Sequence, residues 1–437
     1  MKIRLVVAIV LSTLMAGLSP AGAQVPPVPP GWQMERVVLL ARHGIRAPDQ
    51  SPAELAKYAA SPWPAWPVAP GDLTPRGAVL GREMGLFYRV HYGGRGLIQE
   101  DDCPAPGIVV IWVDIDQRTE LSALSTLGGL YLRCLNPILK HQADISKPDP
   151  LFHPLPSPSC PMDPASNRAA ILERIGGDFT SVRREYAPQL SKLQSALCPP
   201  GTSQAGHACG LAAEAPDIVA RPGGGLAMTG PIAIGALSAE IFMDESAEGM
   251  PANDVAWGRL AGSGDLLDVA KVRRLAGDLM ERTRPIAQQK GSNLLTQITA
   301  ALQDGHKFPG APNITEPVRF GMLVGHDTNI LNVASLLNLD WEIPGYQPGE
   351  AVPGGSLAFE LLKEVGTNQR YVRLAYFAQT PQQMRDAVRL DLDHPPGMTA
   401  VELPACKAYV RNGACPLQRF VEIAKAAIDP ACVTIKP

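Results

Sequence analysis

Three short apolar runs in this chain each end at a polar turn, and a helical pattern follows each turn. The runs cover residues 37–41, 108–113 and 320–324. Continuous apolar runs of this length are typical of strands buried inside an α/β sheet. In open α/β sheets, ligands bind beyond the carboxyl ends of the strands. The pattern therefore predicts an α/β fold whose polar turns lie at one edge of a sheet.

The helices and the remaining strands follow from capping residues and periodicity. Thr74 stands before Pro75, an order typical of a helix start, and the pattern continues to about residue 92. A second helix is expected after the turn at 114–119, continuing to about residue 132, and a third over 329–337. A long helical stretch over 266–302 is interrupted by Pro285, and paired strands are expected over 356–362 and 371–378.

The stretch from residue 146 to residue 262 differs from the segments on either side of it. Proline-rich loops open it, and apolar residues recur at helical spacing over 168–195 and 232–248. We interpret it as a mainly α-helical insertion. The α/β domain then consists of two parts, residues 24–145 and 263–437.

The turn after the first strand carries the most specific chemistry. It reads Arg42-His43-Gly44-Ile45-Arg46-Ala47-Pro48. Two guanidinium groups can grip phosphate oxygens in pairs. A neutral imidazole between them can attack phosphorus and form a covalent intermediate. Gly44 is expected to let the backbone approach a ligand closely, and Pro48 to direct the chain out of the turn.

The other two turns also carry polar side chains. The second turn contains Asp114, Asp116 and Arg118, but two carboxylates without further ligands are weak support for a metal site. On these residues alone, a solvated Asp-Arg pair at a helix start is the favoured reading of Arg118. The third turn is His326-Asp327 before a helix, whose first N–H groups favour an anion. His153 and His207 are interpreted as ordinary polar residues.

Composition and charge narrow the class of protein. The chain has 437 residues, 46% hydrophobic and 19% charged, with a net charge of −3. That balance is ordinary for a globular protein and gives no general attraction to nucleic acid or anionic membrane. Residues 1–23 have a basic start, an apolar run and a small-residue cleavage site. They are predicted to be an export signal, which places the mature protein in the periplasm or outside the cell.

Export makes the eight cysteines interpretable. There is no Cys-x-x-Cys pair, which argues against a zinc or redox motif. An even number in an oxidising compartment predicts four disulfides. The residues alone leave about 105 pairings open.

The Arg42-His43-Gly44-x-Arg46-x-Pro48 motif, with His326-Asp327 far downstream, resembles the signature of the histidine acid phosphatases. The likeness covers nearly the whole mature chain and is greatest to bacterial periplasmic phytases and glucose-1-phosphatases. It implies a mixed central sheet flanked by helices, as in phosphoglycerate mutase, with a smaller inserted α domain as a lid. It also implies the disulfide pairs Cys103–Cys134, Cys160–Cys432, Cys198–Cys209 and Cys406–Cys415.

The resemblance also implies a mechanism. His43 is the expected nucleophile, and Asp327 is the expected proton donor to the leaving group. The residues expected to hold the phosphate are Arg42, Arg46, Arg118 and His326. No metal or cofactor is expected. Because Asp327 must carry a proton, we expect an acidic pH optimum.

The substrate is less closely defined. Related phytases commonly carry Thr-Lys after the first motif, whereas this chain has Asp49-Gln50. A carboxylate there is expected to disfavour a densely anionic substrate such as phytate, so a sugar phosphate is the other option. Glu240 lies where phytases carry a glutamate that faces the substrate, and Thr328 is a further pocket candidate. A solvated helix carboxylate is an equal reading of Glu240.

Two alternatives belong to other classes. A catalytically silent periplasmic binding protein for phosphorylated ligands would use the arginines but not His43 and Asp327 together. A transferase similar to phosphoglycerate mutase shares the Arg-His-Gly strand end, but export and the cysteine pattern argue against it. The expected partner is a small phosphate ester, and the sequence does not indicate an oligomeric state.

Overall fold

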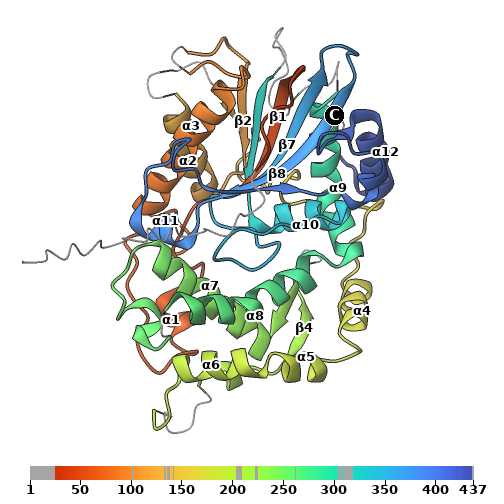
Figure 1. Ribbon diagram of the computed structural model, residues 1–437. Helices are drawn as coiled ribbons and strands as arrows, with labels where there is room; N and C mark the ends of the chain where they lie inside the picture. Colours follow the sequence, from red (N-terminus) through yellow and green to blue (C-terminus); the bar gives the residue numbers. More distant parts are fainter. Residues whose placement is uncertain are drawn as a thin grey trace, which may run out of the picture.

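A computed structural model describes residues 25–100, 103–131, 134, 138–140, 142–202, 209–221, 225–260, 262–303, 308 and 318–435. The predicted export signal lies outside these residues, as does His207. Figure 1 shows a larger lobe built on a sheet and a smaller, mainly helical lobe beside it.

A mixed sheet forms the centre of the larger lobe. Within the described part of the chain, the strands run in the order β10-β8-β7-β1-β6-β2-β3, and β9 pairs with β8. Their bounds are β1 Trp32–Arg42, β2 Val109–Val113, β3 Ile138–Lys140, β6 Phe320–Gly325, β7 Ser356–Glu364, β8 Arg370–Ala378, β9 Gly397–Val401 and β10 Cys415–Pro416. The neighbours β1, β6, β2 and β3 are parallel, while β7 to β10 pair antiparallel. The predicted mixed sheet is confirmed.

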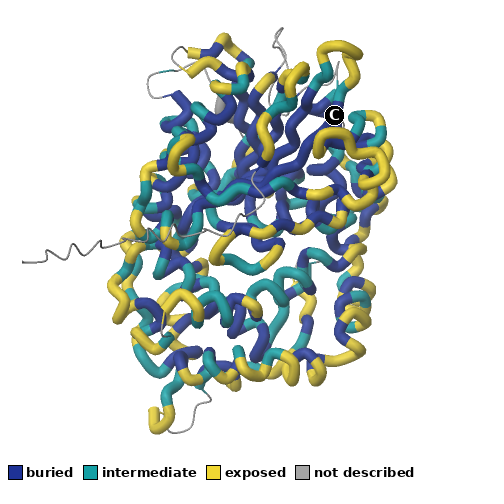
Figure 2. Tube along the Cα trace, in the orientation of Figure 1, coloured by how far each residue is buried: buried dark blue, intermediate teal, exposed yellow. Residues whose placement is uncertain are grey.

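The three apolar runs form the three central parallel strands. Residues 37–41 of β1 are at most 1% exposed, because helices cover both faces of the sheet. Val37 and Leu39 pack toward α2, while Val38 and Leu40 pack toward α9 and α10. The dark strands in Figure 2 show this burial, which explains the continuous apolar pattern.

The helices around the sheet begin close to the predicted positions. α2 has Thr74 as its N-cap, with the hydroxyl accepting from the Gly77 N–H, and Pro75 in its first turn. The helices of this lobe are α2 Pro75–Gly93, α3 Gln117–Leu130, α9 Arg284–Ala301, α10 Asp327–Leu337, α11 Pro381–Asp386 and α12 Leu417–Ala427.

The smaller lobe has its own hydrophobic core. Its elements are α1 Pro52–Leu55, α4 Pro164–Arg174, α5 Thr180–Glu185, α6 Ala187–Leu197, β4 Asp217–Ala220, β5 Leu226–Thr229, α7 Pro231–Ala247 and α8 Ser263–Glu281. The predicted helical spacing over 168–195 corresponds to three helices. Gly176 and Gly177, with φ of 81° and 102°, interrupt it in the left-handed region that favours glycine.

The limits of the insertion, 146–262, stay a prediction. Helix α8 lies after that limit, yet it packs against α7 and α6 of the smaller lobe. Val269 and Leu279 of α8 share a hydrophobic cluster with Ile241 of α7. The expected long helix over 266–302 is divided between α8 and α9, and Pro285 stands in the first turn of α9.

Disulfides connect the eight cysteines in four pairs. They are Cys103–Cys134, Cys160–Cys432, Cys198–Cys209 and Cys406–Cys415, which confirms the pairing implied by the resemblance. The Cys160–Cys432 pair spans 272 residues and ties the C-terminal segment to the start of the smaller lobe.

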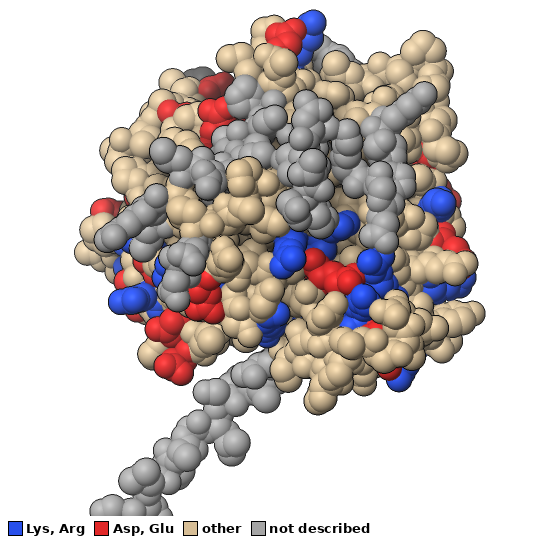
Figure 3. Space-filling model, turned by 90° about the horizontal axis from the view of Figure 1, so that it is seen from above, with Lys and Arg blue, Asp and Glu red and all other residues tan. Residues whose placement is uncertain are grey.

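The surface carries no single dominant charge on the face seen in Figure 3. Basic and acidic side chains lie side by side there, between neutral areas. Among the described residues, every helix is too short or too polar to cross a membrane.

Candidate active site

The predicted motifs meet because their strands are neighbours. β1 pairs directly with β6, so that Arg42 lies opposite Gly325 in the register. The next residues, His43 and His326, therefore leave the sheet side by side, and their rings stand edge to face with centroids 5.5 Å apart. On the other side of β6, β2 leads to Arg118 in the first turn of α3.

His43 is held in the form that a nucleophile needs. Its Nδ1 lies 2.8 Å from the carbonyl oxygen of Gly44. A carbonyl only accepts, so Nδ1 carries the hydrogen and Nε2 keeps a free lone pair. Burial lowers the pKa of His43 well below its ordinary value, and the charges of Arg42, His326, Arg46 and Arg118 lower it further. The ring is therefore neutral.

Gly44 packs closely against its neighbours, and its expected approach to a ligand stays a prediction. A Cβ atom at this position would lie 3.1 Å from Leu73 and 3.2 Å from the Gly77 carbonyl oxygen. The glycine thus lets the turn approach the start of α2. Its N–H donates to the Ser122 hydroxyl of α3, which fixes the turn against both helices.

Each predicted phosphate-binding arginine faces a carboxylate. The Arg42 Nη2 atom lies 2.6 Å from Glu240 Oε1, and its Nη1 donates to the Ala351 carbonyl oxygen. The Arg46 Nη2 atom lies 3.0 Å from Asp49 Oδ2 and 4.0 Å from Glu240 Oε1. Glu240, on α7, therefore points into the cluster and is not a solvated helix carboxylate.

Arg118 extends the same cluster. Its Nη2 atom lies 2.6 Å from Asp116 Oδ2, and its Nη1 atom lies 4.0 Å from Asp49 Oδ1. Asp49 thus stands between Arg46 and Arg118, and its side chain is half exposed. A carboxylate in this position competes with an incoming phosphate for two of the three arginines.

Asp327 begins helix α10 beside Arg42. Its Oδ2 atom lies 3.5 Å from Arg42 Nη2 and 3.1 Å from Arg273 Nη2, while Oδ1 accepts from the Thr328 N–H. Burial raises the pKa of Asp327, but the charges of Arg42 and Arg273 outweigh it and hold the pKa well below the ordinary value. Asp327 is a carboxylate when the arginines face no other anion.

His326 is oriented by a carboxylate that the sequence left without a role. Its Nε2 lies 2.7 Å from Asp114 Oδ2, and Asp114 is fully buried at the end of β2. The Nδ1 atom faces the cluster, 3.5 Å from Arg118 Nη2. His153 Nε2 reaches the same Asp114 oxygen at 2.7 Å. His153 is therefore more than an isolated polar residue.

Four of these side chains have the chemistry of metal ligands. Atoms of Asp114, Asp116, His153 and His326 lie within 4.8 Å of one another, in a set that includes only described residues. Two imidazoles and two carboxylates suit a divalent transition metal. The hydrogen bonds from both histidines to Asp114 account for the same grouping without an ion.

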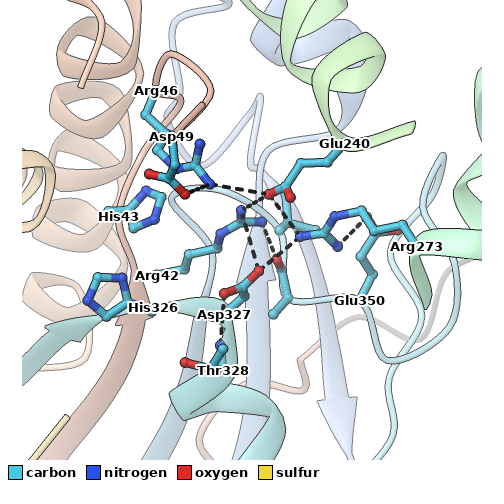
Figure 4. Close-up of polar contacts among 12 residues, drawn as sticks. Arg42, His43, Arg46, Asp49, Glu240, Arg273, His326, Asp327, Thr328 and Glu350 are labelled. Atoms are coloured by element: carbon cyan, nitrogen blue, oxygen red, sulfur yellow. Dashed lines mark hydrogen bonds and ion pairs between the residues drawn. The ribbon is translucent and has the colours of Figure 1, made fainter. Parts of the chain in front are cut away.

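Arg273 and Glu350 complete the cluster, and sequence reasoning missed both. Figure 4 shows Arg273 and Glu350 on one side of Arg42, with His43 and His326 on the other. Arg273 comes from the middle of α8, and Glu350 from the loop before β7. Neither belongs to a motif, and both reach the site only through the packing of the lobes. Thr328 contributes its N–H to Asp327.

Comparison with known proteins identifies the family. Residues 33–203 and 243–376 match the histidine phosphatase superfamily, branch 2. Phytase AppA of Escherichia coli is 34% identical over 411 residues, covering 92% of this chain and 94% of the relative. The glucose-1-phosphatase of Salmonella typhimurium is 27% identical over 427 residues, covering 95% and 98%. The structure of a Hafnia alvei phytase with tartrate has a TM-score of 0.86 at 34% identity, covering 93% and 99%.

A neutral histidine with a free Nε2 atom among arginines, at the edge of a mixed sheet, has the chemistry expected of an enzyme that transfers phosphoryl groups. The chain belongs to the histidine phosphatase superfamily, branch 2, and is a histidine acid phosphatase that hydrolyses phosphomonoesters. The comparisons give no support to a silent binding protein.

Proposed function

We propose that His43 and Asp327 carry out the hydrolysis in two steps. In the first, His43 Nε2 attacks phosphorus, the bond from phosphorus to the ester oxygen breaks, and the Asp327 carboxyl gives its proton to that oxygen. In the second, water attacks the phosphohistidine, the bond between phosphorus and nitrogen breaks, and Asp327 takes the proton of the water. Arg42, Arg46, Arg118 and His326 stabilise the phosphoryl charge throughout.

The hydrogen bond from His43 to Gly44 is the observation that carries this proposal. It fixes the tautomer whose Nε2 lone pair is free, and the surrounding arginines keep the ring unprotonated. A histidine placed only to bind an anion would be most useful as a cation. This environment favours the neutral ring, which suits attack on phosphorus.

The proton on Asp327 has to arrive with the substrate. The surrounding arginines keep Asp327 ionised in the free enzyme. A phosphate monoester with a second pKa of about 6 still carries one proton in mildly acidic solution. Once bound, its negative charge offsets the arginines and raises the pKa of Asp327, which then accepts that proton. Activity is expected to fall as pH rises through the second pKa of the substrate, giving an acidic optimum.

The substrate is expected to be the phosphate ester of a sugar or a cyclitol. The similarity to phytases supports phytate, and the similarity to a glucose-1-phosphatase supports a sugar phosphate. Asp49, which is half exposed, pairs with Arg46 and faces Arg118, and Glu240 and Glu350 add negative charge. These carboxylates repel a leaving group that carries further phosphates. The proposed preference is for esters with one phosphate.

Two further proposals concern the whole chain. Residues 1–23 direct export to the periplasm or beyond, and the four disulfides suit that oxidising compartment. The smaller lobe acts as a lid on the site, because Glu240 and Arg273 reach the sheet edge from α7 and α8.

The test is phosphate release from glucose 1-phosphate, phytate and p-nitrophenyl phosphate between pH 3 and pH 8. Wild-type protein is expected to be most active in acid, and His43→Ala to lose activity on all three esters. The matched control is His394→Ala, an exposed histidine paired only with Asp391 among the described contacts. Wild-type rates in His43→Ala would exclude the nucleophile.

A further inference from the structure

Arg273 is the cation in the cluster for which no predicted role exists. Its side chain is 13% exposed and its guanidinium reaches three carboxylates. Nη2 lies 3.1 Å from Asp327 Oδ2 and 3.4 Å from Glu240 Oε1, and Nη1 lies 3.2 Å from Glu350 Oε1. The three acceptors come from α10, α7 and the loop before β7.

Arg273 and Arg42 hold the same two oxygen atoms. The Nη2 atom of Arg42 lies 2.6 Å from Glu240 Oε1 and 3.5 Å from Asp327 Oδ2. These are the oxygens that Arg273 contacts from α8. Figure 4 shows the two guanidinium groups on either side of them. A cation from the smaller lobe therefore shares the Asp327 carboxylate with a cation from the sheet.

We propose that Arg273 is a positioning residue for Asp327. Its fork fixes the oxygen that faces the ester bond, and its charge keeps that oxygen unprotonated until a phosphate ester binds. The inference rests on the proposed role of Asp327 as proton donor. Because Arg273 lies on α8, the ability of Asp327 to donate its proton then depends on the position of the smaller lobe relative to the sheet.

A purely structural role is the competing explanation. Glu350 is 3% exposed and needs a cation, and Arg273 supplies one. If that were all, losing Arg273 would lower stability and leave the pH dependence of catalysis unchanged. The direct contact with Asp327 Oδ2 predicts a change in that dependence.

The direction of the change follows from the charges around Asp327. Arg42, Arg46 and His326 lower its pKa together with Arg273, while Glu240, Glu350 and Asp244 are the acidic groups of the same cluster. An opposite charge within 4–6 Å lowers a carboxyl pKa by about 1 to 3 units. Without Arg273, the pKa of Asp327 rises.

The higher pKa of Asp327 changes the acid side of the pH profile. The profile of kcat/KM reports groups of the free enzyme. The reactive complex carries one proton in total. It forms from protonated Asp327 and the dianionic ester, or from ionised Asp327 and the monoanionic ester. The concentration of this reactive form falls once the pH is below the pKa of Asp327, because Asp327 and the ester are then both protonated. In Arg273→Met, the acid limb therefore moves to higher pH, by about one unit or more.

The experiment compares Arg273→Met with wild type and with Arg274→Met. Arg274 is the next residue of α8 and faces Asp278 and Asp340 instead of the site. Two esters are used between pH 1 and pH 8, so that the scan reaches the acid limb of the wild type. Glycerol 2-phosphate has an alkoxide that needs a proton to leave, and p-nitrophenyl phosphate has a phenolate that does not. Thermal melting establishes that each variant is folded.

The expected result is an upward shift of the acid limb in Arg273→Met only. The kcat/KM on glycerol 2-phosphate is expected to fall by about tenfold or more, against less than about threefold on p-nitrophenyl phosphate, because kcat/KM reports the transfer to His43, in which the leaving group takes the proton. Arg273→Lys keeps the charge without the fork, so its limb stays near wild type while kcat falls. If Arg273→Met does not fold, Arg273→Lys and Arg273→Gln replace it in the comparison with wild type and Arg274→Met.

Coincident profiles for Arg273→Met, Arg274→Met and wild type on both esters would overturn the inference. An equal loss of kcat/KM on both esters without a shifted limb would also overturn it, because that is the result expected of a purely structural role. Failure of the underlying function looks different: Asp327→Asn would then keep wild-type activity on glycerol 2-phosphate.

Discussion

Replacing Asp114 by asparagine tests how His326 is held in the site. One oxygen of Asp114 accepts hydrogen bonds from His326 and from His153, and the other accepts from the Ile115 N–H. An amide has a single oxygen. If that oxygen stays with Ile115, the NH₂ group faces two ring nitrogens that were donors, and both hydrogen bonds to the imidazoles are lost.

The size of the effect follows from these contacts. A hydrogen bond to a charged group contributes about 1.5 to 3 kcal/mol. Burial raises the pKa of Asp114, but the hydrogen bonds from His153 and His326 lower it well below its ordinary value, so the wild-type group is a carboxylate. If the whole contribution acts through His326 on the phosphoryl group, kcat/KM falls about 10- to 150-fold.

The assay is steady-state phosphate release from glucose 1-phosphate, with inorganic phosphate as a competitive inhibitor. Asp114→Asn is expected to weaken phosphate inhibition along with kcat/KM, because His326 meets both ligands. His153→Asn is the matched control, since it removes the second histidine and leaves the bond to His326. A folded Asp114→Asn protein with kcat/KM within about twofold of wild type would refute the reasoning.

Three other outcomes are expected. Asp49→Asn removes the half-exposed carboxylate beside Arg46. It should raise the ratio of the phytate rate to the glucose 1-phosphate rate by about two- to fivefold, which is the free-energy scale of an exposed ion pair. An unchanged ratio in parallel assays would contradict the role of Asp49 in substrate selection. Dialysis against a chelator should leave kcat unchanged, whereas loss of activity with recovery in Zn²⁺ would show that the four ligand side chains around Asp114 hold an essential metal. Arg373→Met leaves Glu360 buried in the sheet without the arginine that lies 2.7 Å from it, and should lower the free energy of unfolding in urea titrations by about 3–5 kcal/mol. Arg419→Met, on the surface of α12, is the control and should change this free energy little.

The sequence by itself determined the sheet edge and its reactive groups. A buried strand has to be apolar on both faces, and the turn after it is the first place where polar groups reach a ligand. For that reason Arg42 and His43 were predictable from local patterns, as were the strands that carry the motifs and the cap of α2 by Thr74, whereas the roles of Arg118 and Asp327 followed from the resemblance to the histidine acid phosphatases.

Only the tertiary structure decided which groups surround that edge. Arg273 stands in the middle of a helix more than 200 residues from the first motif, and no local pattern separates it from Arg274, which faces another way. Helix α8 brings Arg273 to Asp327 because its apolar face packs on α7. The pairing of His153 with Asp114 likewise depends on a loop returning to the end of β2. Contacts between distant segments arise from the burial of apolar faces, and so the sequence motifs specify the reacting atoms while packing sets their charges and neighbours.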